Sequence, residues 1–287
     1  MTIPCVSVAS RFVSLFCALM LLAGCRELSQ GPAEEPLPVI GEKLSIPTQT
    51  NPHAVGIGRM PGDPDAIVAY LNRPERMIRG AVILLHGCQG LDLGTRLALV
   101  GWNEWWKAYG FATLVVDSLG PRQVDQACVG EDQQEKADVT IRIRDAVVAA
   151  QYLQQLLRLP PERIGVQGFS HGGQTALELA RATSPAFGWV IALYPGCAGE
   201  DPVERPTLVL TGDGDDWTGA DYCEDMARHD TRLKLVVLPR ARHLFDQPLP
   251  ERLAFGHVVA YDSDALNRAK RTMRHFLRDL GALASAS

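Results

Sequence analysis

Short apolar runs alternate with longer amphipathic stretches from about residue 66 to the end of the chain. The short runs are continuous and end at turn residues, which is typical of strands buried on both faces of a sheet. They lie at 66–71, 81–85, 111–116, 164–167, 189–194, 207–211 and 233–238. The amphipathic stretches repeat apolar residues every three or four positions, as helices covering a sheet do, and lie at 97–109, 135–157, 174–182 and 264–280. This alternation predicts one α/β domain, a mostly parallel sheet with helices on both faces.

The first 25 residues form a segment of a different kind. Arg11 precedes the apolar stretch 12–22, which has the length of a signal-peptide core and is shorter than the roughly 20 residues of a membrane span. The stretch ends in Leu22-Ala23-Gly24-Cys25, which resembles the lipobox of bacterial lipoproteins, where the cysteine becomes the lipidated first residue of the mature chain. We therefore expect a signal peptide over 1–25 and a lipid anchor at Cys25. Secretory cleavage without lipidation is the alternative.

The segment that follows is rich in Glu, Pro, Gly and Ser up to Pro38. We expect residues 26–60 to be a flexible tether and residues 61–287 to be the folded domain. This arrangement would hold the domain on the periplasmic side of a bacterial membrane. A soluble periplasmic or secreted protein is the alternative.

Composition limits the partners of this domain. The chain has 46% apolar and 21% charged residues, which is an ordinary globular balance. Its net charge is -5 and it has no run of basic residues, so we expect no nucleic-acid partner.

Four cysteines lie beyond the N-terminal segment: Cys88, Cys128, Cys197 and Cys223. An even number in an oxidising compartment indicates two disulfides. Four cysteines allow three pairings, and we favour Cys88–Cys128 with Cys197–Cys223, because each pair would follow neighbouring strands. The sequence has no C-x-x-C motif, and we expect neither a metal site nor a cofactor.

The segment Gly168-Phe169-Ser170-His171-Gly172 has the pattern G-x-S-x-G. A predicted strand precedes it and a predicted helix follows it, which is the context of a nucleophile elbow. The glycines leave room for the sharp turn that exposes the serine. Ser170 is therefore the candidate nucleophile.

A serine hydroxyl needs a base to become reactive, and that base needs an orienting carboxylate. Two later loops, each after a predicted strand, offer these groups. The loop 212–218 carries three aspartates, Asp213, Asp215 and Asp216, and the loop 239–246 carries His243.

These segments make the chain similar to the dienelactone hydrolase family of α/β-hydrolases over residues 65–281. The two loops resemble the family segments G-x-x-D-D-W-T and G-A-x-H-x-F-D, with Arg240 where a glycine is usual. Residues 86–90 resemble H-G-x-x-G, residues 117–122 resemble D-S-x-x-P-R, and Tyr194-Pro195-Gly196-Cys197 also matches. The resemblance implies an α/β-hydrolase fold.

The resemblance also implies roles for individual residues. It makes Asp215 the orienting acid, with Asp216 and then Asp213 as alternatives, and His243 the base, with His257 as the main alternative. The founding members use a cysteine nucleophile, whereas this chain has Ser170, so their dienelactone specificity is not carried over.

The oxyanion of the reaction needs two backbone N–H donors. The N–H groups of His171, after the nucleophile, and of Cys88, in the segment 86–90, are the candidates. For substrate binding the candidates are Arg122, Tyr194 and Trp217. The alternative for Arg122 is an ion pair with Asp125 or a solvated side chain. The alternative for Tyr194 and Trp217 is a role in packing.

The sequence as a whole predicts an exported serine hydrolase that cleaves small carboxylic esters or lactones. An acyltransferase or a peptidase with the same triad is an alternative, and a non-catalytic lipoprotein of the same fold is another.

Overall fold

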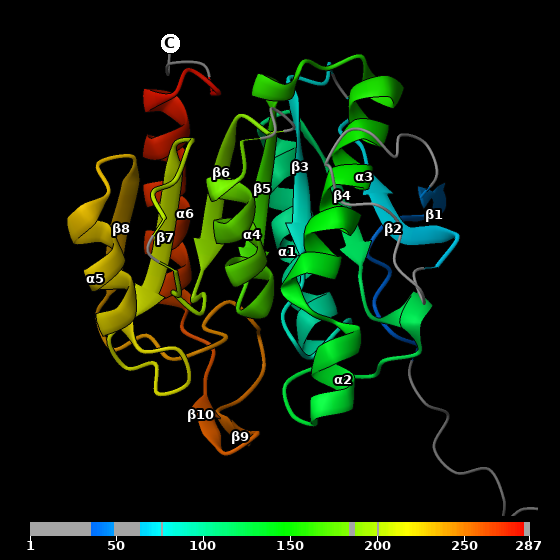
Figure 1. Ribbon diagram of the computed structural model, residues 1–287. Helices are drawn as coiled ribbons and strands as arrows, with labels where there is room; N and C mark the ends of the chain where they lie inside the picture. Colours follow the sequence, from blue (N-terminus) through cyan, green and yellow to red (C-terminus); the bar gives the residue numbers. More distant parts are fainter. Residues whose placement is uncertain (1–35, 49–63, 76, 184–186, 200, 284–287) are drawn as a thin grey trace, which may run out of the picture. The chain divides into compact units, whose positions relative to one another are not determined.

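One mixed sheet organises the protein in a computed structural model that describes residues 36–48, 64–75, 77–183, 187–199 and 201–283 (Figure 1). Within these residues eight strands pair in the order β1-β2-β4-β3-β5-β6-β7-β8. The strands β1 and β2 run antiparallel to their neighbours, and the other six run parallel. Their bounds are β1 Glu42–Pro47, β2 Ala66–Asn72, β3 Gly80–Leu85, β4 Phe111–Asp117, β5 Ile164–Phe169, β6 Trp189–Leu193, β7 Thr207–Gly212 and β8 Leu233–Leu238. The mostly parallel sheet predicted from the sequence is thus confirmed.

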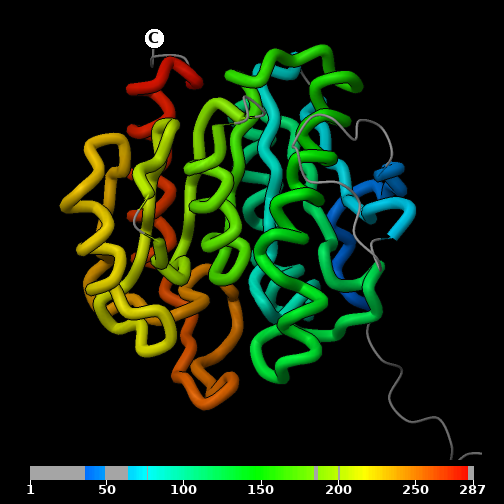
Figure 2. Tube along the Cα trace, viewed as in Figure 1, coloured from blue at the N-terminus to red at the C-terminus, as the bar shows by residue number. Residues whose placement is uncertain are grey.

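Helices cover both faces of this sheet (Figure 1). The helices α1 (Leu93–Ala108) and α6 (Ser263–Asp279) pack on one face. The helices α3 (Val139–Leu157), α4 (His171–Arg181) and α5 (Ala220–His229) pack on the other. Smaller elements join them, and the tube in Figure 2 follows their path: η2 Gly120–Arg122, α2 Glu131–Lys136, η3 Pro161–Arg163, β9 Arg252–Ala254 and β10 His257–Val259.

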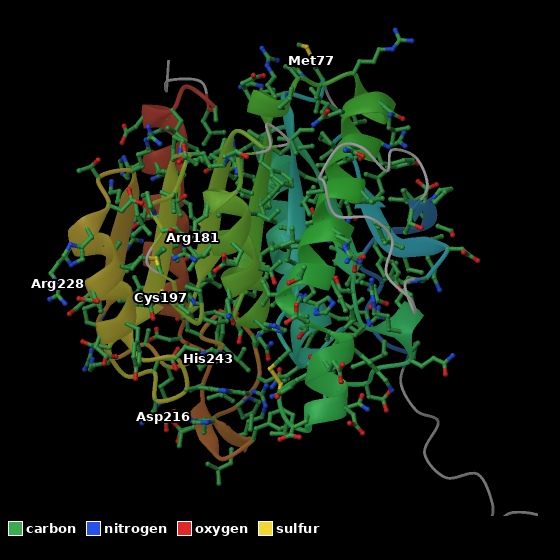
Figure 3. All side chains as sticks on the ribbon, viewed as in Figure 1. Met77, Arg181, Cys197, Asp216, Arg228 and His243 are labelled. Carbon is green, nitrogen blue, oxygen red and sulfur yellow. A yellow bond between two sulfur atoms is a disulfide. The ribbon has the colours of Figure 1, made fainter. Side chains whose placement is uncertain are left out.

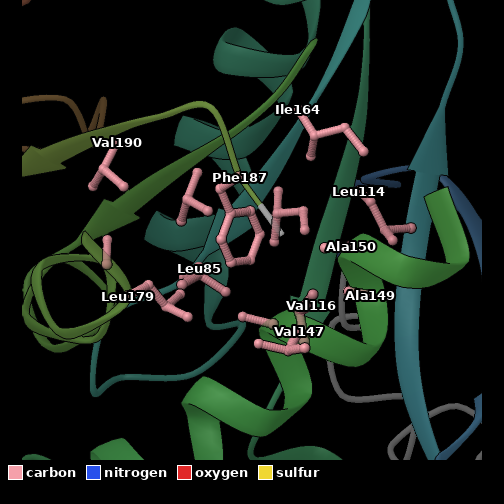
Figure 4. Close-up of a cluster of buried hydrophobic side chains, with 14 of the residues drawn as sticks. Leu85, Leu114, Val116, Val147, Ala149, Ala150, Ile164, Leu179, Phe187 and Val190 are labelled. Carbon is pink, nitrogen blue, oxygen red and sulfur yellow. The ribbon is translucent and has the colours of Figure 1, made fainter. Parts of the chain in front are cut away.

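Each face has its own apolar core. Figure 4 shows part of the first core, where Val147 of α3 lies beside Val116 of β4, and Leu179 of α4 lies beside Leu85 of β3. The second core contains the tryptophans that the sequence places at helical spacing on α1. Trp106 stacks on Trp189 of β6 at 5.6 Å between ring centroids, and its Nε1 donates a 2.7 Å hydrogen bond to Gln167 Oε1. These contacts tie α1 to β6 and to β5, the strand that leads to Ser170.

The carboxyl ends of the parallel strands define the end of the sheet where a site is expected. After β3 the chain adds β4 on one side, and β5 then pairs with the other side of β3. Loops diverge at such a reversal of strand order and leave a crevice beyond the strand ends. In Figure 3, His243 and Asp216 lie at this end of the sheet, and Met77 lies at the opposite end.

Three features differ from or sharpen the sequence prediction. The strand β1 (Glu42–Pro47) pairs with β2 inside the range 26–60 that we expected to be a tether. The signal peptide and lipid anchor, predicted over residues 1–25, lie outside the described residues. The helix predicted at 135–157 is divided between α2 and α3, because Asp138 caps a new helix by accepting a hydrogen bond from Thr140 N–H at 2.8 Å.

Both disulfides favoured by the sequence are present. Cys88 is bonded to Cys128 and Cys197 to Cys223, with Cα atoms 4.9 and 5.1 Å apart. The first disulfide ties the loop after β3 to the loop before α2. The second ties the loop after β6 to α5.

Candidate active site

Ser170 lies on a sharp turn between β5 and α4. Its backbone has φ 52° and ψ -120°, a region that L-residues rarely adopt. The turn requires glycine on both sides, because a Cβ on Gly168 would lie 2.0 Å from the carbonyl oxygen of Gly172, and one on Gly172 would lie 2.1 Å from that of Leu85. The strained turn and the close backbone approach are the geometry of a nucleophile elbow.

Three side chains from separate segments form one hydrogen-bonded chain. His243 Nε2 lies 2.9 Å from Ser170 Oγ, and His243 Nδ1 lies 2.7 Å from Asp215 Oδ2. The side chains of His243 and Asp215 have no exposed surface, and Ser170 is 6% exposed. In this arrangement Asp215 holds the imidazole so that Nε2 can accept the serine proton.

Asp215 is also held as an anion by its own loop. Burial alone would raise the pKa of its carboxyl. The hydrogen bond and charge of His243, together with the amides of Thr218 and Trp217, outweigh burial and lower that pKa. Those two amides donate to Asp215 Oδ1 at 3.0 and 2.9 Å.

The other two aspartates of this loop have different partners. Asp213 accepts a hydrogen bond from the backbone N–H of Arg240. The exposed Asp216 lies 3.7 Å from Nδ1 of His257. His257 in turn stacks on Trp217 at 4.9 Å and forms no hydrogen bond with Ser170 among the described residues. The structure therefore brings Asp215 and His243 to Ser170, and places the alternatives elsewhere.

The two candidate oxyanion donors flank Ser170 from different elements. His171 begins α4, so its N–H has no acceptor within the helix. Cys88 lies in the loop after β3, and among the described residues its N–H is not used in a hydrogen bond. Gly87 lies against the serine, because a Cβ on this residue would be 3.3 Å from Ser170 Cβ.

Arg122 is engaged in a buried ion pair. Its guanidinium donates to both carboxylate oxygens of Asp145 at 2.7 and 2.9 Å, and to the carbonyl oxygen of Ser118 at 2.9 Å. The side chains are only 7% and 3% exposed. The sequence offered an ion pair with Asp125 as the alternative for Arg122. The structure shows an ion pair, but with Asp145 on α3, which is far from Arg122 in sequence. This geometry leaves Arg122 supporting the loop and not reaching toward a substrate carboxylate.

Tyr194 and Trp217 both contact the imidazole of His243, with ring centroids 4.7 and 4.8 Å away. The Tyr194 hydroxyl donates a 2.5 Å hydrogen bond to Asp246 Oδ1, and Trp102 Nε1 donates one of 2.7 Å to Oδ2. Burial raises the pKa of the Asp246 carboxyl. Asp246 thus anchors the aromatic ring that packs against the imidazole.

A small cavity of about 20 Å³ opens beside Ser170. This is roughly the room that one or two water molecules need. Its walls come from the loop after β3, from α1, from β5 and from the loop of His243: Gly87, Cys88, Gln89, Thr95, Ala98, Leu99, Phe169, Ser170, Tyr194, Trp217, His243, Leu244, Asp246 and Gln247. Both aromatic candidates from the sequence line it, and Arg122 does not.

Several residues of the site were not found from the sequence. Thr218 contacts three of its members, since its Oγ1 lies 3.0 Å from Asp215 Oδ2, 3.1 Å from His243 Nδ1 and 3.1 Å from the carbonyl oxygen of Tyr194. Thr218 and Asp246 lie in the same loops as Asp215 and His243, but the sequence pattern of these loops did not indicate a role for either residue. A third, Arg142 of α3, donates to the carbonyl oxygen of His86 in the loop after β3. It gave no signal, because one arginine on an amphipathic helix is usually exposed.

The described residues lack two further features, a group of metal ligands and a membrane-spanning helix. No three His, Cys, Asp or Glu side chains are grouped there as ligands for a metal ion. None of the helices in that part of the chain combines the length and apolar character needed to cross a bilayer.

Known proteins resemble this chain in sequence and in fold. The model of the Dienelactone hydrolase family matches residues 67–280. A Bradyrhizobium protein named as a probable 2-oxo-3-(5-oxofuran-2-ylidene)propanoate lactonase is 26% identical over 223 residues, which cover 68% of this chain and 88% of that protein.

Two solved structures have a similar fold. One is a dienelactone hydrolase from Anabaena variabilis, with a TM-score of 0.58 and 20% identity, covering 82% of this chain and 95% of that one. The other is a Klebsiella pneumoniae protein provisionally called a dienelactone hydrolase, with a TM-score of 0.61 and 15% identity, covering 82% and 98%. At these identities the likeness shows the fold alone.

Proposed function

Because this chain belongs to the dienelactone hydrolase family, we propose that it cleaves small carboxylic esters or lactones through an acyl-serine intermediate on Ser170. The observation that carries the proposal is the hydrogen-bonded chain from Ser170 through His243 to Asp215, at the mouth of a cavity. A nucleophile, a base and an orienting acid in this order are what acyl transfer to serine requires.

The first half of the reaction forms the acyl-serine. Ser170 Oγ attacks the carbonyl carbon while His243 Nε2 takes the hydroxyl proton. The carbonyl oxygen gains negative charge and accepts hydrogen bonds from the N–H groups of Cys88 and His171. The bond to the leaving oxygen then breaks, and His243 returns the proton to that oxygen. When the substrate is a lactone, the released hydroxyl remains attached to the acyl group.

The second half restores the serine. A water molecule gives its proton to His243 Nε2 and attacks the acyl carbon. The tetrahedral intermediate uses the same two donors. It collapses as His243 returns the proton to Ser170 Oγ, which yields a carboxylic acid and free Ser170. Asp215 stays ionised throughout and stabilises the imidazolium that forms in both halves.

The cavity favours small and uncharged acyl groups. Its volume is small, and no Lys or Arg is among the described residues that line it. An anionic acyl group would lose its hydration there without gaining a cation, which is unfavourable. The lactonase named above supports a lactone or ester as the reacting group, and its printed substrate carries a carboxylate that this cavity does not complement.

A fluorophosphonate probe tests the proposal most directly. Native protein should be labelled at Ser170, and Ser170→Ala should not. His243→Ala should lower kcat by orders of magnitude with folding intact, whereas the matched variant His257→Ala should not. The esterase proposal fails if native protein is unlabelled, as a non-catalytic lipoprotein of this fold would be.

Labelling with no ester turnover, but cleavage of a peptide, would identify a peptidase. A product formed from an added alcohol in preference to water would identify an acyltransferase. A screen of p-nitrophenyl esters of increasing chain length, with a few lactones, would then define the substrate.

We further propose that the protein is exported and held at a membrane by a lipid on Cys25, on the periplasmic side. The support is the sequence Leu22-Ala23-Gly24-Cys25 after an apolar stretch, and the two disulfides fit an oxidising compartment. Cys25→Ser should then be recovered as soluble protein. Retention of this variant in the membrane fraction would reject the lipid anchor.

A further inference from the structure

The two oxyanion donors belong to segments that are joined only through the fold. Cys88 follows β3, and His171 begins α4 after β5. Both N–H groups must reach one oxygen atom, so the position of the loop after β3 relative to the elbow decides whether they act together. Two buried side chains, His86 and Arg142, hold that loop.

His86 orients the peptide that carries the first donor. Its Nδ1 lies 2.7 Å from the carbonyl oxygen of Gly87, and its Nε2 lies 3.2 Å from the backbone N of Ser118. Burial, with the nearby charge of Arg142, lowers the pKa of His86 to about 3, so the ring is neutral. Nε2 accepts from Ser118, and Nδ1 therefore donates to Gly87. Because C=O and N–H point in opposite directions in a trans peptide, this bond directs the Cys88 N–H away from the ring.

Arg142 holds the main chain one residue earlier. This side chain comes from α3, has no exposed surface, and donates through Nη2 to the carbonyl oxygen of His86. The elbow passes the same oxygen, because a Cβ on Gly172 would lie 2.4 Å from it. The guanidinium therefore fastens the end of β3 at the point where it meets the segment that carries the second donor.

The burial of Arg142 is costly for the fold. Among the described residues its Nε and Nη1 are buried without a hydrogen-bond partner. Both oxygens of Asp145, the nearby acid, accept from Arg122. A buried guanidinium with one hydrogen bond and no direct carboxylate partner destabilises a protein relative to an apolar side chain. Packing does not explain an arginine here, whereas the bond to the His86 carbonyl does.

We propose that Arg142 is a positioning residue of the oxyanion hole, which acts by fixing the His86 carbonyl and, through the His86 ring, the Gly87–Cys88 peptide. The inference rests on the proposed function, because it assigns the Cys88 N–H to the oxyanion. Loss of Arg142 then weakens binding of the tetrahedral state and leaves binding of the planar ester unchanged.

Arg205 offers a matched control for this test. It is also buried and also donates to a main-chain carbonyl, that of Leu179. Leu179 lies near the far end of α4, roughly 12 Å along the helix from its start. Each change to methionine replaces a buried guanidinium by an apolar side chain, but only the change at Arg142 should affect the oxyanion hole. Arg142→Met, Arg142→Lys, Arg205→Met and Arg205→Lys are compared with native protein.

Three quantities are measured for each variant: kcat and KM for a p-nitrophenyl ester, and Ki for a trifluoromethyl ketone, which binds serine hydrolases as a tetrahedral adduct. Removing an oxyanion donor costs about 10²- to 10³-fold in kcat, so Arg142→Met should lose about 10- to 100-fold. Its Ki should rise by the same factor at an unchanged KM. Arg142→Lys should fall between Arg142→Met and native protein, because an ammonium can donate to the same carbonyl. The Arg205 variants should keep native kcat and Ki.

The inference is wrong if folded Arg142→Met matches Arg205→Met in kcat and Ki. If Arg142→Met does not fold, Arg142→Lys decides, and values equal to those of Arg205→Lys overturn the inference. Native protein without turnover or fluorophosphonate labelling would instead reject the proposed function, and this inference with it. If native protein is active and the Arg142 variants are equally active, the inference about Arg142 is rejected and the proposed function stands.

Discussion

Asp215 Oδ2 lies 2.7 Å from Nδ1 of His243. The carboxylate of the next residue, Asp216, lies 3.7 Å from His257 and is half exposed. Two adjacent aspartates therefore have separate histidine partners, and only one of these histidines contacts Ser170.

We expect Asp215→Asn to lower kcat by about 10⁴-fold, because an amide in this position favours the wrong imidazole tautomer and leaves the imidazolium unstabilised. The matched variant Asp216→Asn should retain kcat within a small factor. Steady-state kinetics on both variants, with circular dichroism to verify folding, provide the measurement. Similar losses from the two changes would contradict the assignment of the acid.

The disulfide Cys88–Cys128 holds the residue proposed to supply one oxyanion donor, whereas Cys197–Cys223 includes neither donor residue. Replacing either pair by alanine should lower the free energy of unfolding by about 2–4 kcal/mol, since the sequence separations of 40 and 26 residues are similar. Only the first pair should also lower kcat, by about 10-fold, because its loop loosens while the donor itself remains.

Urea unfolding and kinetics on both double variants test this difference. Because the second pair controls for general destabilisation, an equal loss of kcat from both pairs would show that the first disulfide stabilises the fold and does not position the donor.

Removing the guanidinium of Arg122 leaves the carboxylate of Asp145 buried and unpaired. Breaking a buried ion pair from one side costs about 3–5 kcal/mol, so Arg122→Met should be much less stable than native protein at neutral pH. Arg228→Met is the matched surface control, because its pair with Asp225 is exposed to water and should contribute little.

The loss at Arg122 should depend on pH. Burial raises the pKa of Asp145, and Arg122 opposes this effect. Without Arg122 the folded-state pKa rises further above the unfolded value of about 3.9. The variant therefore pays an increasing penalty as the pH rises above about 4, and little below it, where the carboxyl is protonated in both states. Urea unfolding between pH 4 and 7 measures this trend, and a penalty that grows toward low pH would contradict it.

The same variant tests the role that the sequence offered for Arg122. A substrate-binding arginine would favour a carboxylate-bearing ester, such as mono-p-nitrophenyl succinate, over the neutral p-nitrophenyl butyrate. We expect the native enzyme to prefer the neutral ester and Arg122→Met to leave the ratio of the two kcat/KM values unchanged. A selective loss for the succinate ester would restore Arg122 as a substrate ligand.

The fold was predictable because its signal is strong and local. Strands buried on both faces appear as continuous apolar runs, and β3, β5 and β7 each begin and end within two residues of the prediction. The strand β1 was missed because it is a mostly polar edge strand. Its apolar residues Leu44 and Ile46 are too few to form a recognisable strand pattern. The hairpin β9–β10 was missed because each of its strands has three residues.

The candidate triad was predictable because each member follows a strand end at the same edge of the sheet. The ion pair of Arg122 with Asp145 and the role of Arg142 were not, because they depend on how α3 packs below the site. Such contacts join residues far apart in sequence, and no spacing rule connects them.

The loop before His243 contains an unfavourable backbone conformation at Arg240, where the family has glycine. Arg240 has φ 61°, a left-handed conformation that costs an L-residue about 1–2 kcal/mol and costs glycine almost nothing. Glycine also increases the entropy of the unfolded chain, which offsets part of the gain. We therefore expect Arg240→Gly to raise the free energy of unfolding by about 0.5–1 kcal/mol.

Arg242 provides the comparison, because it lies two residues later in the same loop and is not among the residues with positive φ. Arg242→Gly has the entropic cost and also loses the exposed pair of Arg242 with Glu251, which contributes little, so it should be less stable than native protein. Urea unfolding of both variants measures whether each change raises or lowers the free energy of unfolding. If Arg240→Gly were destabilised as much as Arg242→Gly, the left-handed conformation at Arg240 would impose no measurable strain.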